Sequence, residues 1–356
     1  MRVALVAPGS VAAAIALLAT ALPSIAFAQA EHRSVRGAHV SIYNLAGRVR
    51  ALAGSGDAVT VEITRGGADR DQLKVETGTI SGRETLRIVY PTDRIVYPAL
   101  RQRSRINIHV RDDGTFSDDG WRRDSRDEVQ IRGSGNGLEA FADLVVRVPK
   151  GQKIDLYLGA GRVEVASVEG DILVDVGAAE VDITGTKGEL TLDTGSGRVA
   201  VRDATGNLNV DTGSGGVTIE RVKGDVLTVD SGSGGIEASD VDVRELSADV
   251  GSGGLRFYRT KATSVNVDAG SGGVNLELLS AIETLEVETG SGGATIRLPA
   301  ALSAELEAET GSGGFTTDFE ITTRRVGRNH VVGRIGDGKG RIRLEAGSGS
   351  IRLLKM

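Results

Sequence analysis

The 356-residue sequence contains no cysteine, 6 proline residues, 4 histidines and a single tryptophan. The absence of cysteine excludes a disulfide framework, a thiolate metal centre and a cysteine nucleophile. So few histidines argue against a histidine-based metal site, and we predict no cofactor. Glycine is abundant, at 50 residues, but without proline it fits neither collagen nor a proline-rich disordered chain. With only 3% aromatic residues, a core must be built from Val, Ile, Leu and Ala.

The N-terminus has the features of an export signal. One positive charge is followed by an apolar run from Val11 to Leu22, then Pro23 and the small-residue segment Ala-Phe-Ala-Gln-Ala. The alternative is an uncleaved anchor, but a spanning helix needs about 20 apolar residues and Pro23 interrupts this run. We predict that residues 1–30 form a signal peptide cut after Ala28 or Ala30. The mature chain, with no membrane span, is then periplasmic, on the cell surface or secreted.

The body of the sequence is a tandem repeat marked by glycine-rich turns. The spacings between successive turns are 18, 18, 18, 19, 19, 19, 20, 21 and 36 residues. A Gly-Ser-Gly signature recurs eight times, after two weaker copies at Gly159 and Gly177. Its first glycines are Gly195, Gly213, Gly232, Gly251, Gly270, Gly290, Gly311 and Gly347. Repeats of this kind indicate an array of equivalent structural units.

The pattern around each turn is that of half-buried β-strands. In the segment Leu208–Ile219, apolar and polar residues alternate on both sides of the glycines. A propeller blade needs about 40 residues, whereas 18 to 21 residues suffice for one coil of a β-solenoid. The six-residue step of left-handed solenoids is absent. We therefore predict an all-β parallel β-helix, right-handed, with about ten regular coils.

The repeats divide the mature chain into two parts. Residues 31–138 are predicted to form irregular N-terminal coils or a cap, with a charged insertion at 91–138. Residues 139–356 are predicted to form the regular solenoid. Charge is segregated: residues 139–310 carry 14 basic and 29 acidic side chains, whereas residues 311–356 carry 9 and 4. We expect a basic C-terminal coil to form the open end of the rod, where its charges would hinder edge-to-edge pairing.

The repeated Asp-Thr-Gly-Ser-Gly-Gly pattern, a Val-Arg-Val-Pro-Lys-Gly segment and the Gly-Ser-Gly-Ser-Ile ending carry a family resemblance. Residues 37–354 resemble a bacterial family known as "putative adhesin". The resemblance implies an exported, glycine-rich β-solenoid domain of unknown biochemical activity, and it supplies no catalytic residues.

An acidic residue stands two positions before each regular turn. By strand alternation these side chains face outward, and stacked coils would place them about 5 Å apart. One interpretation is a cation-binding strip, because closely spaced carboxylates recruit counterions. The other is turn chemistry, in which each Asp accepts the turn N–H groups, and we favour it. Calcium-binding β-rolls place the acid after the glycines, which argues against a structural calcium site. The weak cation-ladder candidates are Asp193, Asp211, Asp230, Asp249 and Asp268.

Hydroxyl residues next to the turns have a structural explanation. Thr194, Thr212, Thr289 and Thr310 have inward parity, so we expect a hydroxyl ladder that closes each corner. A nucleophile there would lack a histidine base. The Gly-Ser-Gly-Gly runs are not phosphate-binding loops, because no lysine follows the glycines. We therefore predict no catalytic residues.

The leading functional hypothesis is an exported, non-enzymatic structural or binding module at the cell envelope, adhesin-like in kind. A rod with many equivalent sites suits binding to a repeating surface polymer or an envelope protein. One alternative is a polysaccharide lyase or hydrolase, which would need a cleft of acids, Arg and aromatics. Another is a scaffold that polymerises end to end. The export signal and the acidic body argue against nucleic-acid binding.

Overall fold

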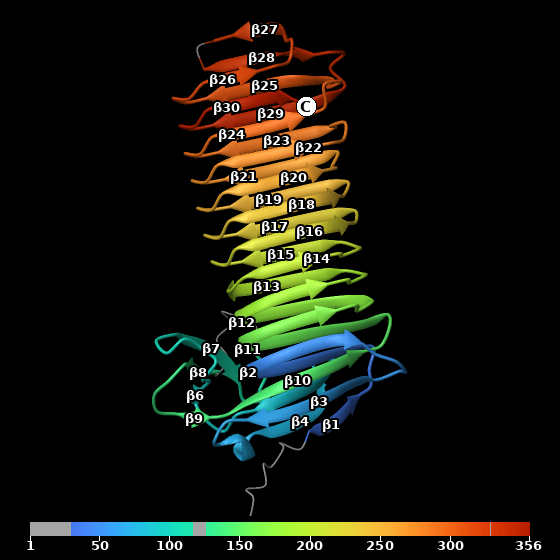
Figure 1. Cartoon of the computed structure of the whole chain (residues 1–356), viewed down its shortest axis with the longest axis vertical. Helices are drawn as coiled ribbons and strands as arrows, with labels where there is room; N and C mark the ends of the chain where they lie inside the picture. Colours follow the sequence, from blue (N-terminus) through green and yellow to red (C-terminus); the bar gives the residue numbers. More distant parts are fainter. Residues whose placement is uncertain (1–29, 117–125, 328) are drawn as a thin grey trace, which may run out of the picture.

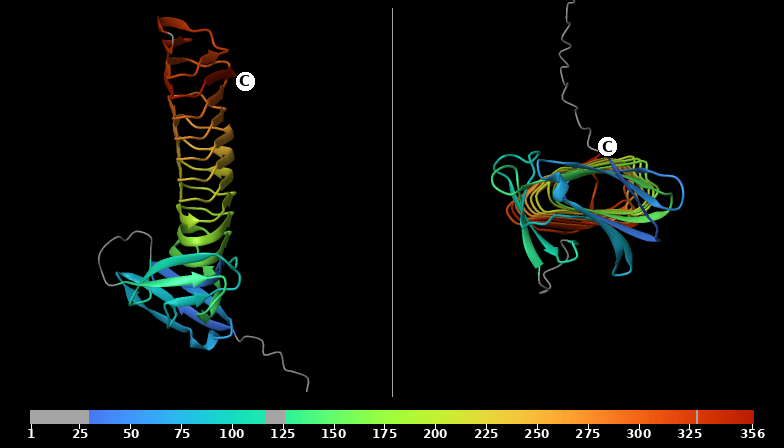
Figure 2. Two further views of the ribbon diagram at one scale, coloured as in Figure 1. Left: turned by 90° about the vertical axis from the view of Figure 1, so that its left-hand side faces the viewer. Right: turned by 90° about the horizontal axis from the view of Figure 1, so that it is seen from below.

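The protein is a β-solenoid, as the repeats predict, with a broader N-terminal end (Figure 1). The computed structural model describes residues 30–116, 126–327 and 329–356. Seen along the rod, the coils form a flattened tube with two walls (Figure 2). The predicted signal peptide lies almost wholly outside the described residues. Within those residues the one helical segment is the 3-10 turn η1 (Arg70–Gln72), and no helix is long and apolar enough to cross a membrane.

Each regular coil contributes one strand to each wall. The strands that precede the glycine turns form the first wall. In sequence order they are β13 (Leu190–Ser196), β15 (Leu208–Thr212), β17 (Val226–Ser231), β19 (Glu245–Val250), β21 (Ser264–Ala269), β23 (Thr284–Thr289), β25 (Ala304–Thr310) and β29 (Gly340–Ala346).

The strands that follow the turns form the second wall. They are β14 (Val199–Arg202), β16 (Val217–Lys223), β18 (Ile236–Asp242), β20 (Leu255–Thr260), β22 (Val274–Leu278), β24 (Ala294–Leu298), β26 (Phe315–Thr317) and β30 (Ile351–Lys355). The first coils are built differently: β11 (Gln152–Ala166) and β12 (Gly170–Thr184) each run through the turn as one long strand.

The core is a set of apolar columns inside the tube. Parallel pairing places equivalent residues of successive coils in register, so Leu192, Val210 and Val229 stack on one another. All three are at most 1% exposed. Burying a Val or Leu side chain contributes about 1.5–3 kcal/mol, so each coil adds several such increments. The alternation read from the sequence is what directs these side chains inward.

The stack begins well before the regular repeats. Strand β2 (His39–Ala53) pairs in parallel with β11, with Ile42 opposite Leu156 and Val49 opposite Val163. The other edge of β2 pairs with β5 (Arg83–Val89) and β10 (Phe141–Val148). Outside these lie β1 (Glu31–Val35), β3 (Val59–Gly66) and β4 (Lys74–Ile80), which pair antiparallel.

The charged insertion forms a separate four-stranded sheet beside the first coils. Its strands are β6 (Arg94–Val96), β7 (Arg105–Arg111), β8 (Arg126–Arg132) and β9 (Leu138–Glu139). Ile108 of β7 packs over the turns at Gly159 and Gly177, and a Cβ on Gly159 would lie 2.5 Å from the Cδ1 atom of Ile108. These two turns are the weaker copies of the repeat. They lack the Gly-Ser-Gly signature where the insertion covers them.

The C-terminal end differs from the sequence expectation. The last coil, β29 and β30, is not the open end of the rod. It lies between the β23–β24 coil and the β25–β26 coil (Figure 1). The hairpin of β27 (Thr322–Val326) and β28 (His330–Ile335) lies beyond it, with β28 antiparallel to β25. The expectation failed because the inward-outward pattern is the same in every coil and does not specify their order.

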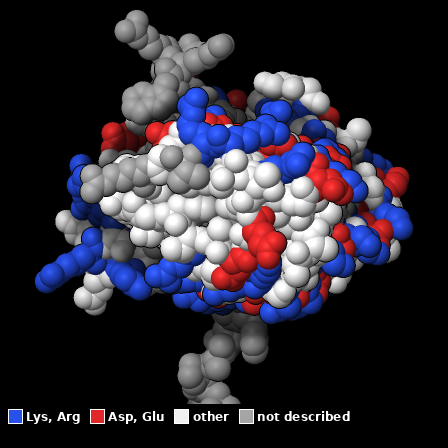
Figure 3. Space-filling model, turned by 90° about the horizontal axis from the view of Figure 1, so that it is seen from above, with Lys and Arg blue, Asp and Glu red and all other residues white. Residues whose placement is uncertain are grey.

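Seen from above, the end of the rod has a broad area without charged side chains, into which a few acidic groups reach, and basic and acidic side chains lie around it (Figure 3). Among the described strands, β27 pairs with β28 alone, so it is an edge strand. Arg324 and Arg325 lie on it and are exposed. Basic residues on an edge strand hinder its pairing with another chain. We expected the last coil to protect the end of the rod in this way, but the β27–β28 hairpin does so instead.

Candidate binding face

The predicted acidic residues form one continuous column on the first wall. Asp193 of β13 stands in register with Asp211, which is followed by Asp230, Asp249 and Asp268 on successive strands. All five candidates named from the sequence are thus brought together. The column extends to Asp175 at one end and, in spatial order, to Glu288, Glu345 and Glu309 at the other.

The middle of this column is an exposed row of like charges. Within the described residues, Asp211, Asp230, Asp249 and Asp268 have no ion-pair partner, and all four are exposed. Burial raises the pKa of Asp230, and the neighbouring Asp211 carboxylate raises it further. Burial also raises the pKa of Asp249, with added contributions from Asp230 and Asp268. These four carboxylates therefore hold negative charge that no basic side chain among the described residues compensates.

A second column of neutral polar residues runs beside the acids on the same wall. It lies two residues before each acid, so both columns face outward. Its members are Thr191, Asn209, Thr228, Ser247 and Asn266, paired in register along the stack. Together the columns present a carboxylate and a hydroxyl or amide group on each of these five coils.

The inward hydroxyls close the turns, whereas the acids do not. Thr212 Oγ1 accepts a hydrogen bond from Gly215 N at 3.2 Å, and Ser231 Oγ donates to the Gly234 carbonyl at 3.0 Å. The predicted hydroxyl ladder is therefore confirmed at Thr212, Thr289 and Thr310, whereas Thr194 points inward but its buried Oγ1 has no hydrogen-bond partner among the described residues. The N–H groups of Gly213 and Gly232 donate to carbonyls of the preceding coil instead. The favoured turn role of the acids is thus wrong for the described residues Asp211, Asp230, Asp249 and Asp268. The parallel ladder already satisfies the turn N–H groups.

The acidic column is a single row of carboxylates rather than a cluster around one point. The described part of the chain contains no group of three or more His, Cys, Asp or Glu side chains arranged to hold a metal ion. The acids stand in a single line along the wall, each in register with the equivalent acids of the neighbouring coils. A metal ion requires several oxygen ligands around one point, which a single row of side chains does not supply.

At the N-terminal end, tyrosines replace the acids in the column. Tyr43 and Tyr157 stand in register below Asp175, and their rings stack at 4.4 Å with an angle of 3° between planes. Phe116 of the insertion packs edge-on against both rings, at 5.7 and 6.3 Å. Both tyrosines are 6% exposed, so the insertion covers this end of the column.

A buried carboxylate beside these tyrosines was missed by the sequence analysis. Asp155 is 3% exposed, and its Oδ2 lies 2.7 Å from His39 Nε2, 2.8 Å from Ser41 Oγ and 3.1 Å from Arg83 Nη1. Arg83 also donates to the Tyr157 hydroxyl at 3.3 Å. The cluster joins β2, β5 and β11.

A sequence signal for this cluster exists. The motif Tyr-x-x-Ala-Gly-Arg-Val occurs at Tyr43 and again at Tyr157. Aligning these two copies places Ser41 beside Asp155, as the structure does. The chemistry is that of a structural anchor. Ser41 and His39 both bind the same carboxylate oxygen, which is not the serine–histidine–aspartate relay that activates a nucleophile.

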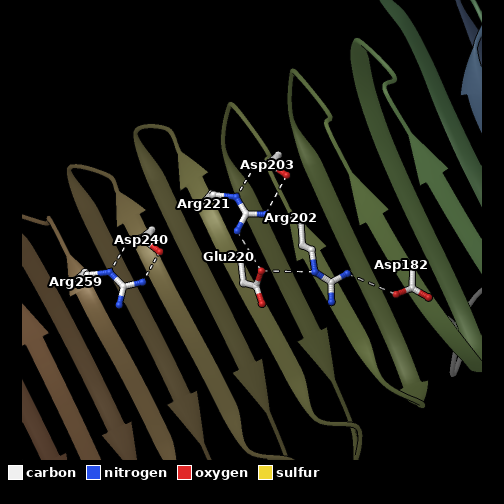
Figure 4. A network of polar contacts seen from close by, with 7 residues as sticks. All are labelled: Asp182, Arg202, Asp203, Glu220, Arg221, Asp240 and Arg259. Atoms are coloured by element: carbon white, nitrogen blue, oxygen red, sulfur yellow. Dashed lines mark hydrogen bonds and ion pairs between the residues drawn. The ribbon is translucent and has the colours of Figure 1, made fainter.

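In contrast to the exposed acids, the charged side chains near the ends of β14, β16, β18 and β20 pair with one another at one corner of the solenoid (Figure 4). Asp203, Arg221, Asp240 and Arg259 occupy equivalent places in four coils, all with φ between 47° and 56°. Arg221 donates to both oxygens of Asp203, at 2.6 and 3.1 Å, and Arg259 does the same to Asp240, at 2.7 and 2.5 Å. These contacts lower the pKa of Asp203 and Asp240. This corner neutralises itself, unlike the acidic column.

One pocket of about 360 Å³ lies between the insertion and the first coils. Its lining includes Tyr90, Asp93, Arg111 and Asp112, the residue types that a polysaccharide-cleaving site would need. However, Tyr90 directs its hydroxyl to Asn44 Oδ1 at 2.9 Å and to the Ala46 carbonyl at 3.0 Å. Arg111 is held by the Thr115 hydroxyl at 3.2 Å. Both side chains therefore have partners within the protein.

Comparison with known proteins identifies the family. The model of the Toastrack DUF4097 family matches residues 122–354. The chain belongs to this family. The Toastrack domain is a β-solenoid of unknown function, so family membership confirms the fold and leaves the adhesin part of the resemblance as a proposal. The crystal structure of a "putative cell adhesion protein" from Clostridium sporogenes is similar at 13% identity and a TM-score of 0.20, covering 92% of this chain and 99% of that one. No curated protein matches the chain.

The Toastrack match begins inside the insertion and includes every regular coil. The acidic column from Asp175 to Glu345 therefore lies within the family domain. The cluster around Asp155 is divided: Asp155 lies inside the matched range, and His39, Ser41 and Arg83 lie outside it.

Proposed function

We propose that this Toastrack protein is an exported, non-enzymatic binding module of the cell envelope, adhesin-like in kind. The observation that carries the proposal is the exposed row of Asp211, Asp230, Asp249 and Asp268, which has no ion-pair partner among the described residues, together with the hydroxyl and amide column beside it. The corner at Asp240 and Arg259 pairs its charges within the protein. The unpaired charge of these four acids is instead available to an external partner.

A repeating polymer is the partner that such a face fits best. Adjacent coils repeat the same groups at the strand spacing of about 4.8 Å. Each contact is weak, but many contacts along one molecule add up through a high effective concentration. Carboxylates accept hydrogen bonds and attract cations. We therefore expect a polymer that presents hydroxyl or amino groups, rather than a polyanion.

A non-catalytic role agrees with the geometry of the polar clusters. The cluster of His39, Ser41 and Asp155 is buried and uses its hydrogen bonds internally. In the pocket at the insertion, Tyr90 and Arg111 are likewise held by neighbouring groups. The buried cluster therefore presents no accessible acid or base, and in the pocket the Arg and Tyr side chains that would hold a substrate beside Asp93 and Asp112 are already engaged.

Binding of the exported full-length protein to purified envelope glycans and envelope proteins tests the proposal. The double variant Asp230→Asn with Asp249→Asn should lose at least tenfold in apparent affinity. The matched control is Glu237→Gln with Glu277→Gln, which makes the same change of charge on the second wall and should bind normally. Equal losses in both variants would show a non-specific charge effect. Release of shortened polymer fragments during incubation would instead support the lyase or hydrolase alternative.

A further inference from the structure

The last coil fills a slot between two coils that precede it in the sequence. Strand β29 pairs in parallel with β23 on one side and with β25 on the other. Strand β30 likewise lies between β24 and β26. Residues 340–355 therefore pair with two strands in each wall. Removing them would leave one edge each of β23, β24, β25 and β26 unpaired.

The slot is specific for a strand–turn–strand segment of defined pattern. It buries Ile342, Leu344, Ile351 and Leu353, all at most 1% exposed. Backbone pairing of this kind is the chemistry of strand addition, in which the ladder gives affinity and alternate side chains give specificity.

The turn of the segment adds a second requirement. A Cβ atom on Gly347 would lie 2.4 Å from the carbonyl oxygen of Gly290, and one on Gly349 would lie 1.9 Å from that of Gly292. Both contacts are with backbone atoms of the neighbouring coil, which cannot move aside cheaply. Only a segment with glycine at both places fits between the coils.

A short surface loop, residues 336–339, leads from β28 into the segment. Strands β28 and β29 flank β25 on opposite sides, so residues 336–339 cross the start of β25. The loop is held there by Ser303, whose Oγ accepts hydrogen bonds from the N–H groups of Asp337 and Lys339 at 3.1 and 3.2 Å.

We infer that the slot is also a binding site for the C-terminal segment of a second copy of this chain. All contacts that define the slot are made by residues 340–356 with the β23–β24 and β25–β26 coils. A segment supplied by another molecule makes the same contacts. Reciprocal exchange of residues 340–356 then joins two rods near their C-terminal ends, and the loop at 336–339 decides between the internal and the exchanged arrangement.

Shortening this loop in the full-length protein tests the inference. The ends of the loop lie two strand spacings apart, about 9–10 Å. Deleting residues 337–339 leaves one linking residue, which spans at most about 7.6 Å between the flanking Cα atoms. The segment can then no longer return to its own slot. We expect a dimer with unchanged strand content by size-exclusion chromatography and circular dichroism. Inserting Gly-Ser-Gly-Ser after Asp337 is the control, and it should remain monomeric.

A peptide-exchange experiment covers the case in which the shortened protein misfolds. A protease site placed in the loop of the full-length protein allows the link to be cut after folding. A labelled peptide of residues 340–356 should then replace the retained segment at one peptide per chain. The peptide with Gly347→Val and Gly349→Val should bind at least tenfold more weakly. A monomeric shortened protein with full strand content, or equal binding of both peptides, would overturn the inference.

Discussion

A Cβ atom placed on Gly215 would lie 1.5 Å from the carbonyl oxygen of Gly197 in the preceding coil. The distance is far below any van der Waals contact, so the backbone of one turn lies directly against that of the next. Gly216, the following residue, has a free environment, since its added Cβ would meet only the Gly235 carbonyl oxygen, at 3.8 Å. The two glycines of the repeated pair thus have different roles. The first permits the turns to stack, whereas no steric contact requires glycine at the second.

Substituting these neighbours separately should give opposite results. Gly215→Ala should destabilise the fold by more than about 2 kcal/mol, because the methyl group forces two coils apart in a packed structure. Gly216→Ala should be neutral or stabilising by up to about 1 kcal/mol, because alanine restricts the unfolded chain. Urea unfolding followed by circular dichroism measures both. Equal effects of the two substitutions would show that the turns do not stack as closely as described.

The sequence predicts the solenoid because each coil repeats the same local signals. Apolar residues such as Val210 and Val229 alternate with polar ones, and glycine marks each turn, so inward and outward faces follow directly. The acidic column from Asp193 to Asp268 could be predicted in the same way. Local patterning determines these features, and the structure retains them.

The order of the coils could not be predicted, because it depends on contacts far apart in the sequence. Strand β29 lies between β23 and β25, where Leu344 stacks between Val287 and Ala308 in the inward column. The same alternation would let Leu344 stack equally well beyond β25. The contact of Ser41 with Asp155 was missed for a related reason: a long closing segment separates two coils that stack directly. Repetition specifies which side of a strand is buried, but not which coil is its neighbour.

Asp155 should anchor the N-terminal coils. Asp155→Ala leaves His39, Ser41 and Arg83 without their shared acceptor, and we expect a loss of about 2 kcal/mol, because Arg83 and His39 remain partly hydrated. Hydrogen exchange followed by mass spectrometry should show faster exchange in β2 and β11 and no change beyond β15. Asp211→Ala, on the same wall but exposed, is the control and should leave exchange in β2 unchanged. Uniform acceleration along the rod would contradict a local anchor.

The solenoid should fold without calcium or another divalent cation. The acids form a single row, and the described part of the chain contains no cluster of ligands around one point. Adding a chelator to the purified protein should shift the midpoint of thermal unfolding by at most a few degrees. A loss of the strand signal in circular dichroism would show that the column from Asp193 to Asp268 holds a structural cation.

The mature protein should begin at Gln29 or Glu31. This expectation rests on the apolar run and the small residues at 26–30, which lie almost wholly outside the described structure. The intact mass of protein recovered from outside the cytoplasm measures the start of the chain. If the major exported species still contained the first apolar run, the segment would be an uncleaved anchor.

The acids of the column and the paired acids of the corner should affect the pH dependence of stability in opposite directions. Burial and the neighbouring carboxylates raise the pKa of Asp249 in the folded state, so the folded protein binds this proton more tightly than the unfolded chain. The stability contributed by this group is then lost as the pH rises from the ordinary pKa of Asp through the higher pKa of Asp249 in the folded state, and the loss persists at pH 7. Asp249→Asn should therefore raise the midpoint of thermal unfolding at pH 7, and the gain should vanish near pH 3.

Asp240 provides the matched control for this experiment. Its ion pair with Arg259 lowers its folded pKa, so its contribution is present above the ordinary Asp value and is lost as the pH falls through the folded value. Asp240→Asn should lower the thermal midpoint at pH 7, and Asn tolerates the left-handed backbone at this corner, so the backbone adds no penalty. Thermal scans of both variants and the parent between pH 3 and pH 8 decide the matter. Shifts of the same sign at pH 7 would mean that the column and the corner do not differ in how they hold their charge.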